Sequence, residues 1–159
     1  MRPTVFFFFS FVAISLFSLS CTHTLRQSPD CMSRFSPERF KTLADRMRTG
    51  EEIDSLNKDA FLSKQAASWA HYNSDRPTIV HYDAERRGPL ERLKHAGFQK
   101  RLVSENIAVM PSQATEADIL ASWKGKKEEE NLLNPLYRNV GFGLAPFKQG
   151  CVFVVLLTE

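Results

Sequence analysis

Glu105 and His81 are the residues of this chain whose types and placement best support chemistry. If residues 102–109 form a strand, Glu105 shares a face with three apolar side chains. These are Val103, Ile107 and Val109. A carboxylate on an apolar face must pair or take up a proton, because burying it alone costs roughly several kcal/mol. His81, on an earlier predicted strand over 78–82, is the partner that the pattern offers. Such a pair can hold a metal, act as acid and base, or only satisfy its own hydrogen bonds.

Other catalytic motifs are absent from the sequence. It has no Gly-x-Ser-x-Gly elbow, no glycine-rich phosphate loop and no His-Glu-x-x-His motif. The formal net charge is +3, from 21 basic and 18 acidic residues, which favours neither nucleic acid nor an acidic polymer as a partner. The basic step Arg86-Arg87 lacks interleaved aromatic residues, so nucleic-acid binding is not expected.

The elements that must position these residues can be predicted from caps, periodicity and turn residues. Helices are predicted near 36–50, 57–73, 89–97 and 115–123, and strands over 78–82, 102–109, 139–144 and 151–157. Trp123 turns inward from the last helix. The final strand is a continuous apolar run, which is typical of a strand covered on both faces. Gly141 and Gly143 share one face of the preceding strand, where another chain segment can come close. Together these elements predict an α+β fold with helices on both sides of a small sheet.

The order of motifs from His81 onwards resembles a known family. The series is His81, Arg92-Leu93, Ala96-Gly97-Phe98, Ser104-Glu105-Asn106-Ile107-Ala108, Trp123, Asn131-x-x-Asn134-Pro135 and Val140-Gly141-x-Gly143. This series is similar to the bacterial branch of the CAP superfamily (cysteine-rich secretory proteins, antigen five and plant pathogenesis-related proteins), also called SCP-like. The resemblance implies a three-layer α-β-α sandwich around a small antiparallel sheet. It fixes no reaction, because the family has no single agreed activity.

The resemblance also implies that His81 and Glu105 point into one central cavity, and that Asn106 ties neighbouring loops together. Trp123, Asn131, Gly141 and Gly143 match structural positions of the family. The family's second His is missing, and Glu128 stands at its position, so we expect Glu128 at the rim of the cavity. One imidazole with two carboxylates is a poor zinc site. No cofactor is expected, and His81, Glu105 and Glu128 are candidates only for a weakly held divalent cation.

Residues 1–20 have the pattern of a signal peptide. Arg2 provides the positively charged N-terminal region of such a peptide. The apolar run that follows is shorter than a typical membrane-spanning helix, and small residues precede Cys21. Cys21 also matches the acceptor of a bacterial lipoprotein signal, although Ser18 stands where Leu is usual. We expect lipidation of Cys21, with plain secretion and an uncleaved anchor as the alternatives. The membrane is then a partner through the N-terminal lipid.

The mature chain is divided into a tether at residues 21–35 and a CAP-like domain at residues 36–159. Cys31 and Cys151 form an even pair, which favours a disulfide in an oxidising compartment. The alternative is that Cys151 is an ordinary buried thiol in a strand. The implied fold brings the first helix and the last strand close at their ends, so we expect that the two cysteines can pair.

These features favour an extracytoplasmic protein of the cell envelope, either lipid-anchored or secreted, that acts as a binding or interaction module. By analogy with eukaryotic relatives the ligand is an apolar molecule or lipid, and a host or envelope protein is a further alternative. The rival hypothesis is an envelope hydrolase or peptidase that uses His81 and Glu105. A third hypothesis is a structural surface lipoprotein without a ligand. The missing second His favours the binding module over the enzyme.

Overall fold

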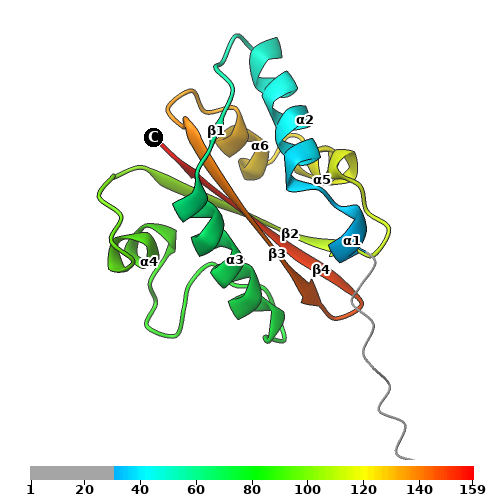
Figure 1. Cartoon of the computed structure of the whole chain (residues 1–159), viewed down its shortest axis with the longest axis vertical. Helices are drawn as coiled ribbons and strands as arrows, with labels where there is room; N and C mark the ends of the chain where they lie inside the picture. Colours follow the sequence, from blue (N-terminus) through cyan, green and yellow to red (C-terminus); the bar gives the residue numbers. More distant parts are fainter. Residues whose placement is uncertain (1–30) are drawn as a thin grey trace, which may run out of the picture.

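The computed structural model describes residues 31–159, which fold into helices packed around one sheet (Figure 1). Along the chain the elements are α1 Cys31–Arg34, α2 Pro37–Gly50, β1 Asn57–Lys58, α3 Ala60–Ser74, α4 Pro89–His95, β2 Val103–Pro111, α5 Glu116–Trp123, α6 Lys127–Leu132, β3 Asn139–Phe147 and β4 Gly150–Thr158. Cys21 and the predicted signal peptide lie outside the described residues. Between residues 31 and 159, no helix has the length and apolar character needed to cross a membrane.

The sheet has the strand order β1-β3-β4-β2. β4 lies in the middle and runs antiparallel to both neighbours, with Val154 opposite Ile107 of β2 and Gly143 of β3. The predicted hairpin of the last two strands is therefore confirmed. The three long strands form the predicted small antiparallel sheet, and a short parallel pairing of Asn57 and Lys58 with β3 adds one edge. Helix α3 starts only after that pairing, with Asp59 as its cap.

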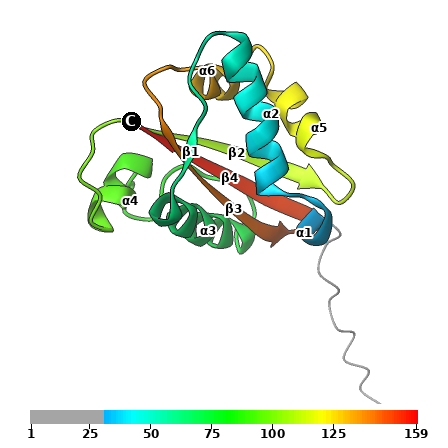
Figure 2. The same cartoon turned by 45° about the horizontal axis from the view of Figure 1, so that its top comes forward.

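Two helical layers cover the sheet, as Figure 2 shows. Alternate residues of β4 enter different cores, because successive strand side chains point to opposite faces. Val155 packs in the core formed with α2, α5 and α6, and Val154 packs in the core formed with α3 and α4. Every residue of β4 is buried, as its continuous apolar sequence predicts. The predicted three-layer α-β-α arrangement is confirmed.

Glycines allow α3 to lie directly on β3. A Cβ atom added at Gly141 would lie 2.2 Å from the backbone carbon of Leu62, and one added at Gly143 would lie 2.1 Å from that of Ala66. Neither helical backbone atom can move without shifting α3. The predicted close approach at these glycines is therefore a helix backbone resting on the sheet.

A disulfide joins Cys31 to Cys151, with their Cα atoms 6.2 Å apart. Both cysteines are fully buried, and the next residue after α1, Phe35, is also buried and packs on Phe40 with the ring centroids 6.3 Å apart. The expected pairing is thus present. The boundary at residue 36 is too late, because residues 31–35 belong to the packed domain and not to the tether.

The start of α2 is fixed to the start of α5. Glu116 Oε1 accepts hydrogen bonds from the Ser36 N–H at 2.6 Å and from Arg39 Nη2 at 2.9 Å. Burial of Glu116 opposes its ionisation, but these hydrogen bonds outweigh burial and lower the pKa of the carboxyl group. Thr115 and Asp118 form the predicted cap of α5 as a reciprocal capping box.

Arg48 connects α2 to the loops around α6. Its side chain is fully buried and donates to the carbonyl groups of Asp54 at 2.7 Å and Tyr137 at 2.8 Å, and also to those of Leu132 and Asn134. Burial lowers the pKa of Arg48, although the charges of nearby acids oppose that shift. Five guanidinium hydrogen atoms allow one residue to bind several carbonyl groups at once.

Candidate functional site

The side chains of His81 and Glu105 meet beside α4. Glu105 projects from β2 toward the α3–α4 layer, and its side chain is only 1% exposed. His81 is about half exposed, and its Nδ1 lies 2.9 Å from Glu105 Oε1. The alternation of β2 produces this result, since Val103 and Ile107 pack in the same core. The expected contact between the two residues is therefore present.

His81 does not reach this position from a strand. Residues 78–82, predicted as a strand, form an irregular segment. The reason is that the buried side chain of Asn73 takes the place of a strand partner. Its Oδ1 accepts from the Val80 N–H at 2.9 Å, and its Nδ2 donates to the Val80 carbonyl group at 3.3 Å. The end of α3 thus fixes the backbone immediately before His81.

Arg92 is the second partner of Glu105. It lies on α4, and its Nη2 donates to Glu105 Oε2, while Nη1 donates to the backbone carbonyl group of His81. Burial lowers the pKa of Arg92, and the Glu105 charge opposes that shift. The sequence pattern contains Arg92 only as part of a motif and assigns it no role. The sequence feature that could have indicated its role is an arginine in the short helix after His81, where its charge can meet that of Glu105.

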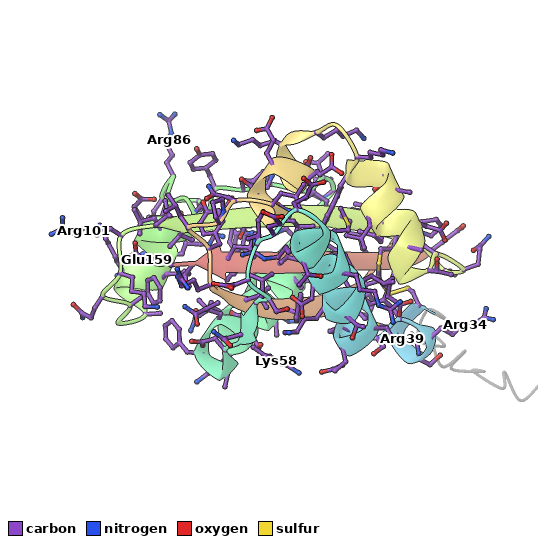
Figure 3. The ribbon with its side chains drawn as sticks, turned by 90° about the horizontal axis from the view of Figure 1, so that it is seen from above. Arg34, Arg39, Lys58, Arg86, Arg101 and Glu159 are labelled. Carbon is purple, nitrogen blue, oxygen red and sulfur yellow. A yellow bond between two sulfur atoms is a disulfide. The ribbon has the colours of Figure 1, made fainter. Side chains whose placement is uncertain are left out.

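A compact turn holds the segment between His81 and α4. Asp83 Oδ1 accepts from the N–H groups of Glu85 at 3.0 Å and Arg87 at 2.8 Å, and Asp83 Oδ2 accepts from Arg87 Nε. Burial opposes ionisation, but the Arg87 hydrogen bonds outweigh it and lower the pKa of Asp83. Arg86 has a left-handed backbone, with φ of 61°, and points into solvent (Figure 3). The turn keeps the His81 carbonyl group within reach of Arg92.

Glu128 does not join this cluster. Asn106 follows Glu105 on β2 and therefore points to the opposite face. There its Nδ2 donates to the backbone carbonyl group of Glu128 at 2.8 Å, and its Oδ1 accepts from Asn131 Nδ2 at 2.7 Å. Asn106 and Asn131 thus tie β2 to α6, as the resemblance implies. The expectation that Glu128 lines the rim is wrong because α6 packs in the other helical layer.

The arrangement also bears on metal binding. Among residues 31–159, no group of three or more His, Cys, Asp or Glu side chains is placed to hold a metal ion. The weak cation site expected from His81, Glu105 and Glu128 is therefore not assembled. Trp123 has a structural place, since it is buried and packs edge-on against Phe40 with the ring centroids 5.6 Å apart.

The geometry favours an oriented imidazole. Both carboxylate oxygens of Glu105 are engaged, one by His81 and one by Arg92. When Glu105 is ionised it can only accept, so His81 Nδ1 carries the proton of that hydrogen bond, and in the neutral imidazole Nε2 then presents a lone pair. An imidazole held in this way can accept a proton or a hydrogen bond from a molecule in solvent.

A separate open cavity of about 720 Å³ lies at the other end of β2. It is lined by residues 77–79, the end of β2 with the turn that follows, and the β3–β4 turn. Val109 lines it and is 52% exposed, which few large apolar side chains between residues 31 and 159 are. Pro77, Ile79 and Phe147 add further apolar lining. None of its lining residues belongs to the His81–Glu105–Arg92 cluster.

Comparison with known proteins identifies the fold. No family model and no curated protein matches the sequence. Among solved structures, an outer surface protein of Borrelia burgdorferi matches with a TM-score of 0.67 at 20% identity, over 77% of this chain and 90% of that one. An extracellular SCP-domain protein of Bacillus anthracis matches with a TM-score of 0.64 at 19% identity, over 77% of this chain and 39% of that one. A cysteine-rich secretory protein of Staphylococcus aureus matches with a TM-score of 0.57 at 13% identity, over 85% of this chain and 40% of that one.

The described domain therefore has the CAP fold, also called SCP-like. This result confirms the fold that the motif series implies. At these identities the likeness defines the arrangement of the helices and strands, and the chemistry must be argued from this chain's own residues.

Proposed function

We propose that this chain is an extracytoplasmic binding module of CAP fold, attached to a membrane by lipid on Cys21, and that it binds an apolar ligand. The observation that carries the proposal is the open cavity beside Val109. Its volume of about 720 Å³ is within the range of small-molecule sites, roughly 300–1,000 Å³. An apolar ligand would cover Val109, and burial of apolar surface provides the favourable free energy.

The nature of the structural neighbours supports a place outside the cytoplasm. One is an outer surface protein and another is an extracellular protein. The Cys31–Cys151 disulfide supports the same location, because disulfides persist in oxidising compartments. Mass spectrometry of the protein from its native cells tests the anchor. A mature N-terminus at Cys21 with added acyl mass is expected, and a free thiol and amine at Cys21 would leave secretion without an anchor.

The cavity is tested with a fluorescent fatty acid. Val109→Asp places a charge in the apolar lining and should weaken binding by roughly a factor of ten or more, since burying a carboxylate is costly. Leu136→Asp is the matched control, because Leu136 is 62% exposed and does not line the cavity. Equal binding by the wild type and the Val109 variant would contradict the proposed ligand site, as would equal losses in both variants.

A second candidate function is an envelope hydrolase or peptidase. The observation that favours it is the half-exposed His81 imidazole, which Glu105 orients and which presents Nε2 to solvent. Among the described residues, the only side-chain hydrogen bond of His81 is with Glu105, so no nucleophilic side chain is bonded to it. Loss of hydrolysis in His81→Ala, with the fold intact and with activity retained in the exposed-residue control His95→Ala, would favour the enzyme.

A further inference from the structure

Three buried side-chain polar atoms without a hydrogen-bond partner lie on α3 and just after its end. They are Trp69 Nε1, Tyr72 Oη and Arg76 Nε, and no other such atom occurs between residues 31 and 159. Trp69 and Tyr72 are three residues apart and so share one side of α3, and Arg76, just beyond the helix, lies over the Tyr72 ring. Buried polar groups are normally paired, so each exception calls for an explanation. Three unpaired atoms so close together call for a common explanation.

The side chains of this row are held in a stack. The Arg92 guanidinium lies 3.5 Å from the centroid of the Trp69 ring. The rings of Trp69 and Tyr72 are stacked with centroids 4.4 Å apart and planes 14° apart. The Arg76 guanidinium covers the far side of Tyr72 at 3.8 Å from the centroid. A cation therefore closes each end of the stack, and the polar atoms are fixed before any ligand arrives.

Two cavities open along the stack. A recess of about 70 Å³ is lined by Trp69 and Arg92 together with Gln65 and Ser68. A larger open cavity of about 570 Å³ is lined by Tyr72 and Arg76, and again by Ser68. The shared Ser68 places the two cavities next to each other. A ligand in the larger cavity would lie against Tyr72 and Arg76, and Trp69 borders the adjoining recess.

The charges and donors of the row favour an acceptor. Indole N–H and guanidinium groups can only donate hydrogen bonds. Arg76 has no ion pair among the described residues, whereas Arg92 is paired with Glu105. The acidic residue of the lining is Asp75, which is exposed and has a 3.5 Å hydrogen bond from Ser74. His71 adds a further titratable group to the lining.

We propose that the row of Trp69, Tyr72 and Arg76, here called the donor row, binds a small oxyanion, either a carboxylate or a phosphate. Charge-assisted hydrogen bonds from Arg76, with the indole N–H and the tyrosine hydroxyl as further donors, recognise such a group. None of the three donor-row residues lines the cavity beside Val109, so the anion site can be tested apart from the proposed function. Because Pro77 lines both the larger cavity of the stack and the cavity beside Val109, the oxyanion is either a free anion or the head group of a lipid.

The test is a titration followed by NMR. The sequence has two tryptophans, so the ¹⁵N-labelled protein gives two indole N–H signals, which Trp69→Phe assigns. Inorganic phosphate or acetate, added at constant ionic strength with chloride, should shift the Trp69 signal to saturation and leave the Trp123 signal unchanged. Arg76→Gln should weaken the apparent affinity by roughly tenfold. Arg46→Gln, an exposed position on α2 in the other helical layer, should not change it.

Tyr72→Phe provides a second test that keeps the stacked ring. It removes only the hydroxyl group and should also weaken the titration. Lysophosphatidate distinguishes the two sources of the phosphate. If it binds more tightly than inorganic phosphate, and Val109→Asp reduces that binding, the ligand is a lipid head group. If the two bind equally, the ligand is a free anion. The proposal is overturned if neither anion shifts the Trp69 signal, if Arg76→Gln and Arg46→Gln behave alike, or if the indole N–H shows contact with an ordered water and no response to anions.

Discussion

Arg92, more than His81, should determine the stability of the buried Glu105 carboxylate. The Glu105 side chain is 1% exposed and that of Arg92 is 14% exposed, whereas that of His81 is 51% exposed. Arg92→Gln would leave Glu105 with a single partner that solvent already reaches. His81→Ala would leave the carboxylate bound to the buried arginine. The two substitutions therefore remove contacts of very different value.

The size of each effect follows from burial. Two unit charges about 4 Å apart interact with roughly 4 kcal/mol at an effective dielectric constant of about 20. Removing one member of a buried pair costs about 3–5 kcal/mol, because the other charge stays buried. Arg92→Gln should therefore lower the free energy of unfolding by about 3 kcal/mol. His81→Ala, which removes one half-exposed hydrogen bond, should lower it by about 1 kcal/mol.

Urea unfolding followed by circular dichroism measures these free energies. Because Arg92 also packs on Trp69, Arg92→Gln is combined with Glu105→Gln in a double-mutant cycle, which isolates the pair. Arg46→Gln is the control and should change stability by less than about 0.5 kcal/mol. Equal losses in the Arg92 and His81 variants, or strict additivity of the Arg92 and Glu105 substitutions, would refute this reasoning.

Three further predictions concern the fold. Replacing Cys31 and Cys151 together by Ser should cost about 2–4 kcal/mol in urea unfolding, since the disulfide closes a loop with a sequence separation of 120; an unchanged midpoint would contradict this. Gly143→Ala should lower the thermal midpoint sharply because its Cβ would meet the α3 backbone, whereas Gly50→Ala, with nothing within 4 Å, should not. The lowered pKa of Glu116 contributes stability above its unfolded pKa of about 4.3 that is lost as pH falls through the folded value. Glu116→Gln should therefore flatten the acid limb of a stability–pH profile, and an identical slope in both proteins would argue against it.

Local patterns in the sequence were sufficient to predict much of the fold and the contact between His81 and Glu105. The side-chain period of two in a strand placed Glu105 on an apolar face, and a buried carboxylate needs a partner. His81 meets that requirement at 2.9 Å. Capping at Ser36 and Thr115 and the hairpin of β3 and β4 also depend on neighbouring residues, so sequence patterns can predict them.

Contacts between distant segments had to come from the tertiary structure. The position of Glu128 depends on which helical layer α6 joins, and the Asn106 hydrogen bond to α6 shows that it is the layer opposite Glu105. The segment before His81 is irregular because Asn73 binds its backbone, and no local pattern indicates that contact. The partnership of Arg92 with Glu105 and the donor row on α3 likewise arise where α3, α4 and β2 pack together. Side-chain type and spacing determine what a residue can do, while packing decides which distant group it meets and whether that group is buried.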